Sequence, residues 1–334
     1  MKLRKIAGIL DKTRLRSLLA ACLPARGIVG LNYHRIGDGS SSELDRGLWS
    51  ASVEGFDQQL AWLKLNSDVI SPADIDSARK DPRSRHVLIT FDDGYLDNYE
   101  FAFAALRRHG LPGTFFIATG FIDDPRLPWW DEIASLVRRS SVEAIALPQW
   151  LPEPQPLVVG QRESVVRKLL SRYKSLPTEE ASRFMADLRD AARASPAASG
   201  EDLWMSWDML REMDAAGMTI GGHTVNHVVL SGATAEQQWL EISTCAARIE
   251  SEIGKRMDYF AYPVGNRDSF NGDSMECLRR LGVRYAFSYY GGFADARANR
   301  YDMPRMAIEP YIDPNWFRAI VELPRIFCRE NAPA

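Results

Sequence analysis

The neighbouring acids Asp92 and Asp93 are the residues of this sequence whose types and position first suggest catalysis. They follow the apolar, β-branched run 87–91, which is typical of a buried strand, and Gly94 comes directly after them. A strand interior would not accommodate two adjacent carboxylates, so we expect both at the carboxyl end of the strand. On its own, the stretch also fits an ordinary Asp-Gly turn with a capped helix behind it.

A pair of histidines supplies the second half of the candidate site. His223 and His227 are two of the five histidines in the chain, and they follow the strand-like segment 218–220. Two imidazoles and one carboxylate are a typical ligand set for a catalytic divalent ion that keeps one position open. A further carboxylate beside such an ion can accept a proton from the attacking water. Spacing alone leaves open a pair of ordinary histidines, since this spacing is common on helices.

Three motifs make the interpretation more specific. Thr-Phe-Asp-Asp-Gly at 90–94, His-Thr-x-x-His at 223–227 and Phe-Ala-Tyr-Pro-Val-Gly at 260–265 follow one another along the chain. Their order and spacing resemble those of the polysaccharide deacetylase family (carbohydrate esterase family 4), which includes chitooligosaccharide and poly-N-acetylglucosamine deacetylases. The resemblance covers most of residues 28–120 and 204–320. It implies a hydrolase that deacetylates N-acetylated sugar units of a poly- or oligosaccharide, in exopolysaccharide or cell-envelope metabolism.

The resemblance also implies separate roles for the first four residues. Asp93, His223 and His227 would hold one divalent metal ion. Zinc is the default expectation, and cobalt, iron or nickel suit the same ligands. Asp92 would be the general base that accepts the proton of the attacking water. Two alternatives remain: a carbohydrate-binding relative that has lost turnover, and an amide hydrolase acting on a molecule other than a sugar.

The third motif departs from the family pattern. Ala261 and Val264 stand where the family usually carries an arginine that orients the base and a tyrosine. The backbone N–H of Val264 survives any change of side chain and is the candidate oxyanion donor, with Tyr262 beside it as a substrate contact. Arg305, near the last predicted strand, is the candidate to orient the base.

His34 is the candidate general acid that protonates the leaving amine. It follows the predicted strand 28–33, and some poly-N-acetylglucosamine deacetylases carry a similar Tyr-His-Arg whose histidine lies in the active site. The family's usual histidine near the last strand is missing, since no histidine follows His227. We expect His86 and His109 to be structural because one precedes a strand and the other ends a helix. From the residues alone, a surface histidine remains the alternative for His34.

The elements that must position these residues are strands alternating with helices. Strand-helix-strand units imply a parallel sheet, and parallel barrels do chemistry at the carboxyl ends of their strands. The sequence therefore predicts an α/β fold, a distorted (β/α)7 parallel barrel formed by residues 27–334. The predicted strands are 28–33, 87–91, 114–119, 218–222, 258–262, 285–289 and 303–308, and the longer helices are 53–65, 97–109, 207–216, 235–253 and 273–281.

Residues 123–200 interrupt this alternation and predict a mostly helical insertion beside the mouth of the barrel. Expected helices cover about 131–139, 162–174 and 178–193. Trp129 and Trp130 open the insertion, where they either stack against sugar rings or pack the insertion onto the barrel.

Residues 1–26 form a separate basic segment, with seven lysines and arginines against the single acid Asp11. Apolar residues between them predict an amphipathic helix that either lies on an anionic membrane surface or packs on the domain by a few leucines. The pattern does not decide between these two placements.

The composition sets broader limits. A net charge of −3 gives no reason to expect a nucleic acid partner, and the four cysteines lack the close pairing of disulfide or zinc scaffolds, which suits a reducing compartment. No apolar run approaches the roughly 20 residues of a membrane span. Residues 15–23 would be a poor secretory signal because Arg16 interrupts their short apolar run. We therefore expect a cytoplasmic protein, with membrane contact through residues 1–26 as the open alternative and the oligomeric state undetermined.

Overall fold

The computed structural model describes residues 2–13, 15–22, 27–81, 85–195, 199–295 and 297–328. Eight parallel strands form its central sheet. Seven of them follow one another around a barrel, which a parallel bridge between Phe287 and Met303 nearly closes. This confirms the predicted (β/α)7 fold. In sheet order the strands are β11 (Tyr285–Phe287), β10 (Tyr259–Ala261), β9 (Thr219–Gly222), β6 (Thr114–Ile117), β5 (His86–Phe91), β1 (Ile28–Tyr33) and β12 (Arg305–Ala307).

Strands β1 and β5 form the best-developed pair in the sheet. They pair in register along their whole length, from Ile28 opposite His86 to Tyr33 opposite Phe91, and every residue of both strands is buried. Aligned parallel strands end at the same edge of a sheet, so the residues that follow β1 and β5 come together there. Three shorter strands lie outside the barrel order: β4 (Asp68–Val69), which pairs with β5, and β2 (Arg35–Ile36), which pairs with β3 (Trp49–Ala51).

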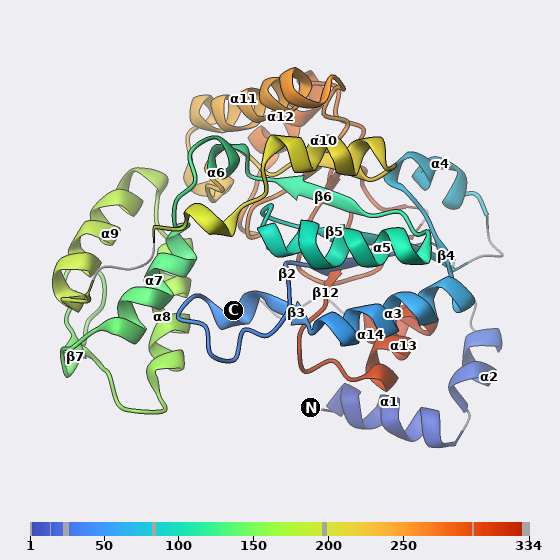
Figure 1. Cartoon of the computed structure of the whole chain (residues 1–334), viewed down its shortest axis with the longest axis horizontal. Coiled ribbons are helices and arrows are strands. Elements are labelled where there is room, and N and C mark those ends of the chain that lie inside the picture. Colours follow the sequence, from blue (N-terminus) through green and yellow to red (C-terminus); the bar gives the residue numbers. More distant parts are fainter. Residues whose placement is uncertain are drawn as a thin grey trace.

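Helices cover the outside of the barrel (Figure 1). Local signals set their ends: Thr234 caps α11 through the N–H of Gln237, and Gly254 ends it in a left-handed conformation. A π-helical turn at 98–103 precedes α5. The covering helices are α3 (Val53–Asn66), α4 (Ile75–Ala78), α5 (Ala104–His109), α6 (Thr119–Asp123), α10 (Trp207–Ala215), α11 (Ala235–Ile253), α12 (Gly272–Arg280), α13 (Pro314–Glu322) and α14 (Pro324–Phe327).

Several observed strands are shorter than the sequence predicts. The predicted strand 114–119 ends at Ile117, because Thr119 already begins α6 and the N–H of Thr119 donates to the carbonyl of Thr224. The apolar, β-branched character of a segment marks it as buried, but the ladder stops where the backbone turns away from the neighbouring strand.

The insertion forms a helical lobe beside the barrel, on the left of Figure 1. It contains α7 (Trp129–Arg139), α8 (Arg162–Lys174) and α9 (Thr178–Ala192), and α7 packs against both other helices. A two-stranded antiparallel sheet of β7 (Ala144–Ile145) and β8 (Gln155–Pro156) joins α7 to α8. Helix α8 has the bounds that the sequence predicts.

The N-terminal segment forms two helices rather than one, α1 (Lys2–Lys12) and α2 (Leu15–Cys22), and both pack on α13. They lie at the lower right of Figure 1, on the other side of the barrel from the insertion. Among the described helices, none is both long and apolar enough to cross a membrane.

Candidate active site

Three of the predicted site residues meet at the carboxyl ends of β5 and β9. The Nε2 atoms of His223 and His227 lie 3.5 Å and 3.3 Å from Oδ1 of Asp93. All three side chains are buried, and they are the one group of potential metal ligands that converges within the described residues. Asp93 follows β5 and the two histidines follow β9, so strand ends 130 residues apart in the sequence supply one site.

The arrangement fits a divalent metal ion. Two ligand atoms about 2.1 Å from one ion at a tetrahedral angle lie about 3.4 Å apart, close to both observed separations. Oδ1 of Asp93 is buried without a hydrogen-bond donor in the described structure, as expected of an atom that binds a cation. His223 donates its Nδ1–H to the carbonyl of Ala261 over 2.7 Å, which leaves the lone pair of Nε2 directed toward Asp93.

The surroundings favour the protonation states that bind a metal. Burial raises the pKa of Asp93, but the neighbouring imidazoles of His223 and His227 outweigh burial and lower that pKa below its usual value. Burial lowers the pKa of His227. A charged carboxylate and a neutral imidazole are the forms that act as ligands.

Asp92 is held separately, by Arg305. The Nη1 and Nη2 groups of Arg305 donate to Oδ1 and Oδ2 of Asp92 over 2.7 Å and 2.9 Å and form a bidentate ion pair. The Arg305 side chain is fully buried. Burial raises the pKa of Asp92, but the charge of Arg305 outweighs it and holds the pKa below the usual value. Arg305 therefore lies where the sequence placed the group that orients the base, although it comes from β12 rather than from the third motif.

Polar residues inside two strands complete this arrangement. Asn32 of β1 donates to Oδ2 of Asp92 over 3.2 Å and accepts from Nη1 of Arg305 over 2.5 Å, and Thr90 of β5 accepts from the same Nη1 over 3.1 Å. A Cβ atom at Gly30 would lie 2.9 Å from Cγ of Arg305, so this glycine leaves the space that the arginine crosses. The sequence alone assigned no role to these three residues. For Asn32 and Thr90 the available signal was a polar side chain in an otherwise apolar strand.

His34 lies at the end of β1, beside the two acids. Tyr33 pairs with Phe91 in the aligned strands β1 and β5, so His34 and Asp92 follow at the same edge of the sheet. The ring of His34 meets the ring of Tyr289 edge to face with centroids 5.2 Å apart, and its carbonyl accepts from the side chain of Asn98 over 2.7 Å. The imidazole is half-buried, which suits a group that exchanges protons with substrate.

Tyr289 and Glu309 extend the same edge of the site and were not predicted. The Tyr289 hydroxyl donates to Oε1 of Glu309 over 3.3 Å, and burial raises the pKa of Glu309 to about 7. The available signal was positional, since Tyr289 ends the predicted strand 285–289 and Glu309 follows the predicted strand 303–308.

The third motif, residues 260–265, contributes the backbone N–H of Val264 to the site but not the side chain of Tyr262. Val264 has a φ of +63°, and within the described structure its N–H donates no hydrogen bond, so it remains available to a ligand. The expectation that Tyr262 contacts substrate is wrong. Its side chain is 1% exposed, stacks on Phe270 at 3.9 Å, and donates its hydroxyl to the carbonyl of Tyr301 over 2.7 Å. These contacts hold the ring in the core behind the site.

The insertion packs directly on a metal-ligand candidate. The ring of Trp130 lies 4.3 Å from the ring of His227, and its Nε1–H donates to the hydroxyl of Tyr95 over 2.7 Å. Tyr95 in turn donates to Oδ2 of Asp131 over 2.7 Å. Trp130 is buried, so packing is its role, whereas Trp129 is half-buried and also donates to the carbonyl of His227 over 3.4 Å.

Unusual backbone geometry is concentrated at this site. Among the described residues, five non-glycine residues have a positive φ, and only Arg193 lies outside the site. The other four are Asp93 (78°), Thr224 (65°), His227 (52°) and Val264 (63°). A positive φ costs an L-residue about 1–2 kcal/mol, and such strain persists chiefly at functional sites.

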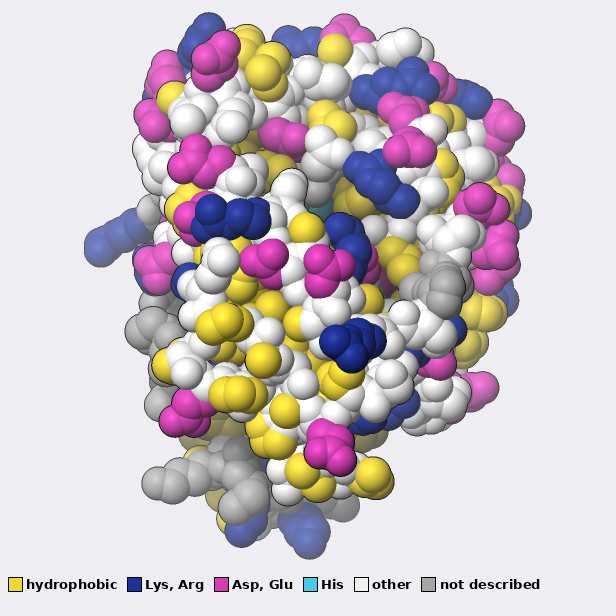
Figure 2. Space-filling view, turned by 90° about the vertical axis from the view of Figure 1, so that its left-hand side faces the viewer, with side chains coloured by type: hydrophobic (Ala, Val, Ile, Leu, Met, Phe, Trp, Pro, Cys, Tyr) yellow, Lys and Arg dark blue, Asp and Glu magenta, His cyan; other side chains and the backbone are white. Residues whose placement is uncertain are grey.

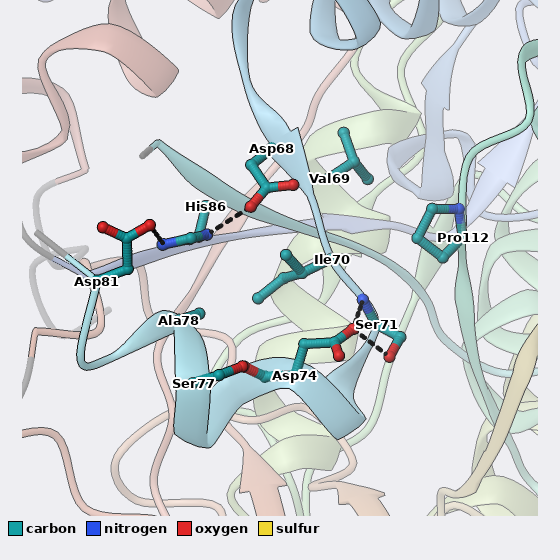
Figure 3. Close-up of a pocket in the computed structure, with 10 residues that line it drawn as sticks. All are labelled: Asp68, Val69, Ile70, Ser71, Asp74, Ser77, Ala78, Asp81, His86 and Pro112. Atoms are coloured by element: carbon teal, nitrogen blue, oxygen red, sulfur yellow. Dashed lines mark hydrogen bonds and ion pairs between the residues drawn. The ribbon is translucent and has the colours of Figure 1, made fainter. Parts of the chain in front are cut away.

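The remaining histidines are structural, as the sequence indicates. His86 begins β5 at the opposite end of the barrel strands, where its Nδ1 lies 3.1 Å from Asp68 and its Nε2 lies 3.9 Å from Asp81 (Figure 3). Because these two acids face opposite edges of the ring, they do not form a common ligand set with it. His109 ends α5 and bonds Asp57 through Nε2 over 2.9 Å.

The face that Figure 2 shows, on the side of the insertion, is hollowed near its centre. A histidine side chain is visible in this recess among acidic and basic side chains. Solvent can therefore reach a histidine side chain through this recess.

The sequence is similar to a known protein family and to a protein of that family. The sequence pattern of the family described as "Polysaccharide deacetylase" matches residues 79–146 and 173–286, more than half of the chain. The protein named "Putative polysaccharide deacetylase YxkH" of Bacillus subtilis (strain 168) is 21% identical over 296 residues, which cover 87% of this chain and 75% of that protein.

Solved structures share the fold. The Streptococcus pyogenes deacetylase PplD, in complex with acetate, is similar with a TM-score of 0.58 and 20% identity over 87% of this chain and 96% of its own. IcaB from Ammonifex degensii has a TM-score of 0.55 and 20% identity over 89% and 96%. With the matched family pattern, the barrel and the motifs at its strand ends, the chain belongs to the polysaccharide deacetylase family.

Proposed function

We propose that this protein is a metal-dependent hydrolase that removes acetyl groups from N-acetylated sugar units of a poly- or oligosaccharide. The observation that carries this proposal is the convergence of Asp93, His223 and His227, next to the separately held carboxylate of Asp92. Hydrolysis of an amide needs an activated water, a stabilised oxyanion and a proton for the leaving amine. The site has a candidate group for each.

A divalent ion held by Asp93, His223 and His227 would supply Lewis acidity, which acidifies water and polarises a carbonyl oxygen. Zinc remains the first expectation for this ligand set, with cobalt, iron or nickel as alternatives. His223 uses its Nδ1–H in the bond to the carbonyl of Ala261, which leaves its Nε2 to face the ion, and the pKa of Asp93 lies below its usual value, which favours the charged carboxylate.

Asp92 would accept the proton of the attacking water. Its ion pair with Arg305 keeps it ionised, and the contact with Asn32 fixes the orientation of the carboxylate. The absence of an arginine at position 261 was the reason to consider a carbohydrate-binding relative without turnover. Arg305 supplies the missing contact from another strand, which supports turnover over binding alone.

The other steps need an oxyanion donor and an acid. The unpaired N–H of Val264 is the candidate donor to the oxygen that becomes negative when water adds to the acetamide carbon. His34, beside both acids, would protonate the sugar nitrogen as the C–N bond breaks. Acetate and a free amine would leave the site.

The class of substrate rests on the family and its relatives. The acetate held by the S. pyogenes deacetylase has the chemistry of the acid released in a deacetylation. A role in exopolysaccharide or cell-envelope metabolism is the setting that we propose, because N-acetylated polysaccharides occur there.

Acetate release from N-acetylglucosamine oligomers tests the proposal. The wild type, Asp92→Asn and Asp93→Ala should be compared after dialysis, with the metal content of each measured by mass spectrometry. We expect Asp92→Asn to retain the ion and lose activity about 10²–10⁴-fold, because it lacks only the base. Asp93→Ala should lose both the ion and the activity.

Three results would each contradict a different part of the proposal. Full activity of Asp92→Asn would show that another group is the base. If the metal-loaded wild type releases no acetate from any acetylated sugar, turnover is not its function. Faster hydrolysis of an amide that contains no sugar would exclude the proposed substrate class while leaving the metal site intact.

A further inference from the structure

Helices α1 and α2 expose an unusual amount of apolar surface. Of the ten large apolar side chains exposed among the described residues, four belong to this short segment: Ile6 (43% exposed), Ile9 (60%), Leu15 (44%) and Leu18 (59%). Each helix presents two of them, three residues apart, so each pair lies on one side of its helix. Scattered apolar residues are normal on a protein surface, but four within thirteen residues are a concentration.

The opposite sides of the same helices are fixed to the domain. Ala7 and Ala20 are 0% and 5% exposed and pack in the core. Arg4 pairs with Asp313 over 2.7 Å, at the start of α13. Arg16 pairs with Glu322 near the end of α13 over 2.5 Å. The two helices are therefore anchored on α13 along its length, and their exposed apolar residues face away from the domain.

The charge of this surface is positive. Asp11 is the only acid of residues 1–26, and it lies 2.8 Å from Arg16, which also pairs with Glu322. Lys5 and Lys12 are exposed and form no ion pair with any described acid. The basic residues Arg14 and Arg26 lie outside the described ranges.

We propose that this surface, formed by Ile6, Ile9, Leu15 and Leu18 with Lys5 and Lys12, docks the protein reversibly on an anionic lipid membrane. Helices that lie in a membrane interface combine exposed aliphatic side chains with lysines that contact anionic headgroups. A second copy of the chain is a poor occupant, because it would bring the same positive charges face to face. The proposal is independent of the proposed function, since none of these residues belongs to the catalytic site.

Docking through short helices would be weak and dependent on charge. Four aliphatic side chains insert only to the depth of the headgroup boundary, and attraction to anionic lipid falls within a Debye length of about 8 Å at physiological salt. We therefore expect binding that requires anionic lipid and decreases as salt increases.

Co-sedimentation of the full chain with lipid vesicles tests the proposal. Vesicles of phosphatidylcholine mixed with phosphatidylglycerol should bind the wild type, and vesicles of phosphatidylcholine alone should bind it at least about tenfold more weakly. Ile9→Glu/Leu18→Glu should reduce binding to the mixed vesicles at least about tenfold, because it places two carboxylates in the apolar contact. Lys5→Glu/Lys12→Glu should reduce binding and remove most of its salt dependence.

Leu240→Glu is the matched control. Leu240 is 55% exposed, close to Ile9 and Leu18, but lies on α11 at the opposite end of the molecule in Figure 1. This variant should bind vesicles as the wild type does. Circular dichroism and acetate release should be unchanged in all these variants, so lost binding would not reflect unfolding.

Two results would overturn the proposal. One is wild-type binding that is equal on neutral and anionic vesicles, or absent from both. The other is a dimer, detected by light scattering, that Ile9→Glu/Leu18→Glu converts to a monomer, since the surface would then be an interface between two copies.

Discussion

Replacing Arg305 by methionine tests whether this arginine both orients Asp92 and keeps it ionised. The side chain is fully buried and donates two hydrogen bonds, of 2.7 Å and 2.9 Å, to the carboxylate. Removing one partner of a buried ion pair costs about 3–5 kcal/mol, because the other charge is left without compensation. Hydrogen bonds to charged groups contribute about 1.5–3 kcal/mol each, which gives a similar total.

Loss of this interaction with Arg305 should also raise the pKa of Asp92, because the ionised carboxylate would no longer be stabilised. One pKa unit corresponds to about 1.4 kcal/mol, so the loss of Arg305 should raise this pKa by about two to four units. The base must be ionised to accept a proton, so the acidic limb of the pH–rate profile should move to higher pH in Arg305→Met. Acetate release measured between about pH 4 and about pH 9 gives both profiles.

The free energy of unfolding should also depend on whether Asp92 is ionised. The wild-type pKa of Asp92 lies below its unfolded value, so the stability that it contributes is present above the unfolded pKa and is lost as the pH falls through the folded pKa. In Arg305→Met the carboxylate should destabilise the protein near neutral pH, and the deficit should shrink in acid as Asp92 takes up a proton. Urea unfolding at about pH 7 and about pH 5 measures this change.

The double variant Arg305→Met/Asp92→Asn is the decisive control. Each single substitution leaves one buried charge unpaired, and the double variant leaves none, so it should be more stable than the sum of the two losses predicts. Strictly additive losses of stability, or a pH–rate profile unchanged in Arg305→Met, would refute the assignment of Arg305.

Three further substitutions probe the site and its support. Gly30→Ala should displace Arg305, because the new Cβ would lie 2.9 Å from Cγ of that arginine, and acetate release should fall about ten- to hundredfold while the metal content is unchanged. Val264→Gly keeps the backbone N–H and relieves a positive φ, so activity should stay within about threefold and urea stability within about 1 kcal/mol of the wild type; a large loss of activity would implicate the side chain. Burial raises the pKa of Asp131 to about 7, above its unfolded value, so ionisation opposes folding and wild-type stability should fall as the pH rises from about 4 toward 7. Asp131→Asn should flatten that fall in urea titrations, and an equal slope would contradict the raised pKa.

The sequence predicts best the parts of the fold that local chemistry determines. Strand β1 and helices α8 and α11 have the predicted bounds, because β1 is apolar and ends in polar residues, while α11 carries a capping threonine and a terminal glycine. The short strands β2, β3 and β4 have too few residues to leave a periodic pattern. Cytoplasmic location stays a prediction.

In the site, too, short motifs are easier to recognise from the sequence than contacts between residues that lie far apart in it. Asp93, His223 and His227 belong to short motifs after strands, and their convergence follows from the parallel arrangement of the sheet. The contact between Arg305 and Asp92 spans 213 residues and depends on the space above a glycine in a third strand. Tyr262 was misplaced because a motif fixes the path of the backbone but not the side of it to which each side chain turns.

The strained residues explain how two adjacent acids can act in one site. Neighbouring residues of an extended strand point to opposite faces, so Asp92 and Asp93 could not both reach one centre if β5 continued through them. The positive φ of Asp93 ends that alternation, and Asp93 then meets the histidines while Asp92 stays against Arg305. Glycine would adopt this conformation without strain, but it carries no ligand atom. The barrel therefore tolerates about 1–2 kcal/mol of strain at Asp93, and again at His227, because ligand side chains are needed where the backbone favours glycine.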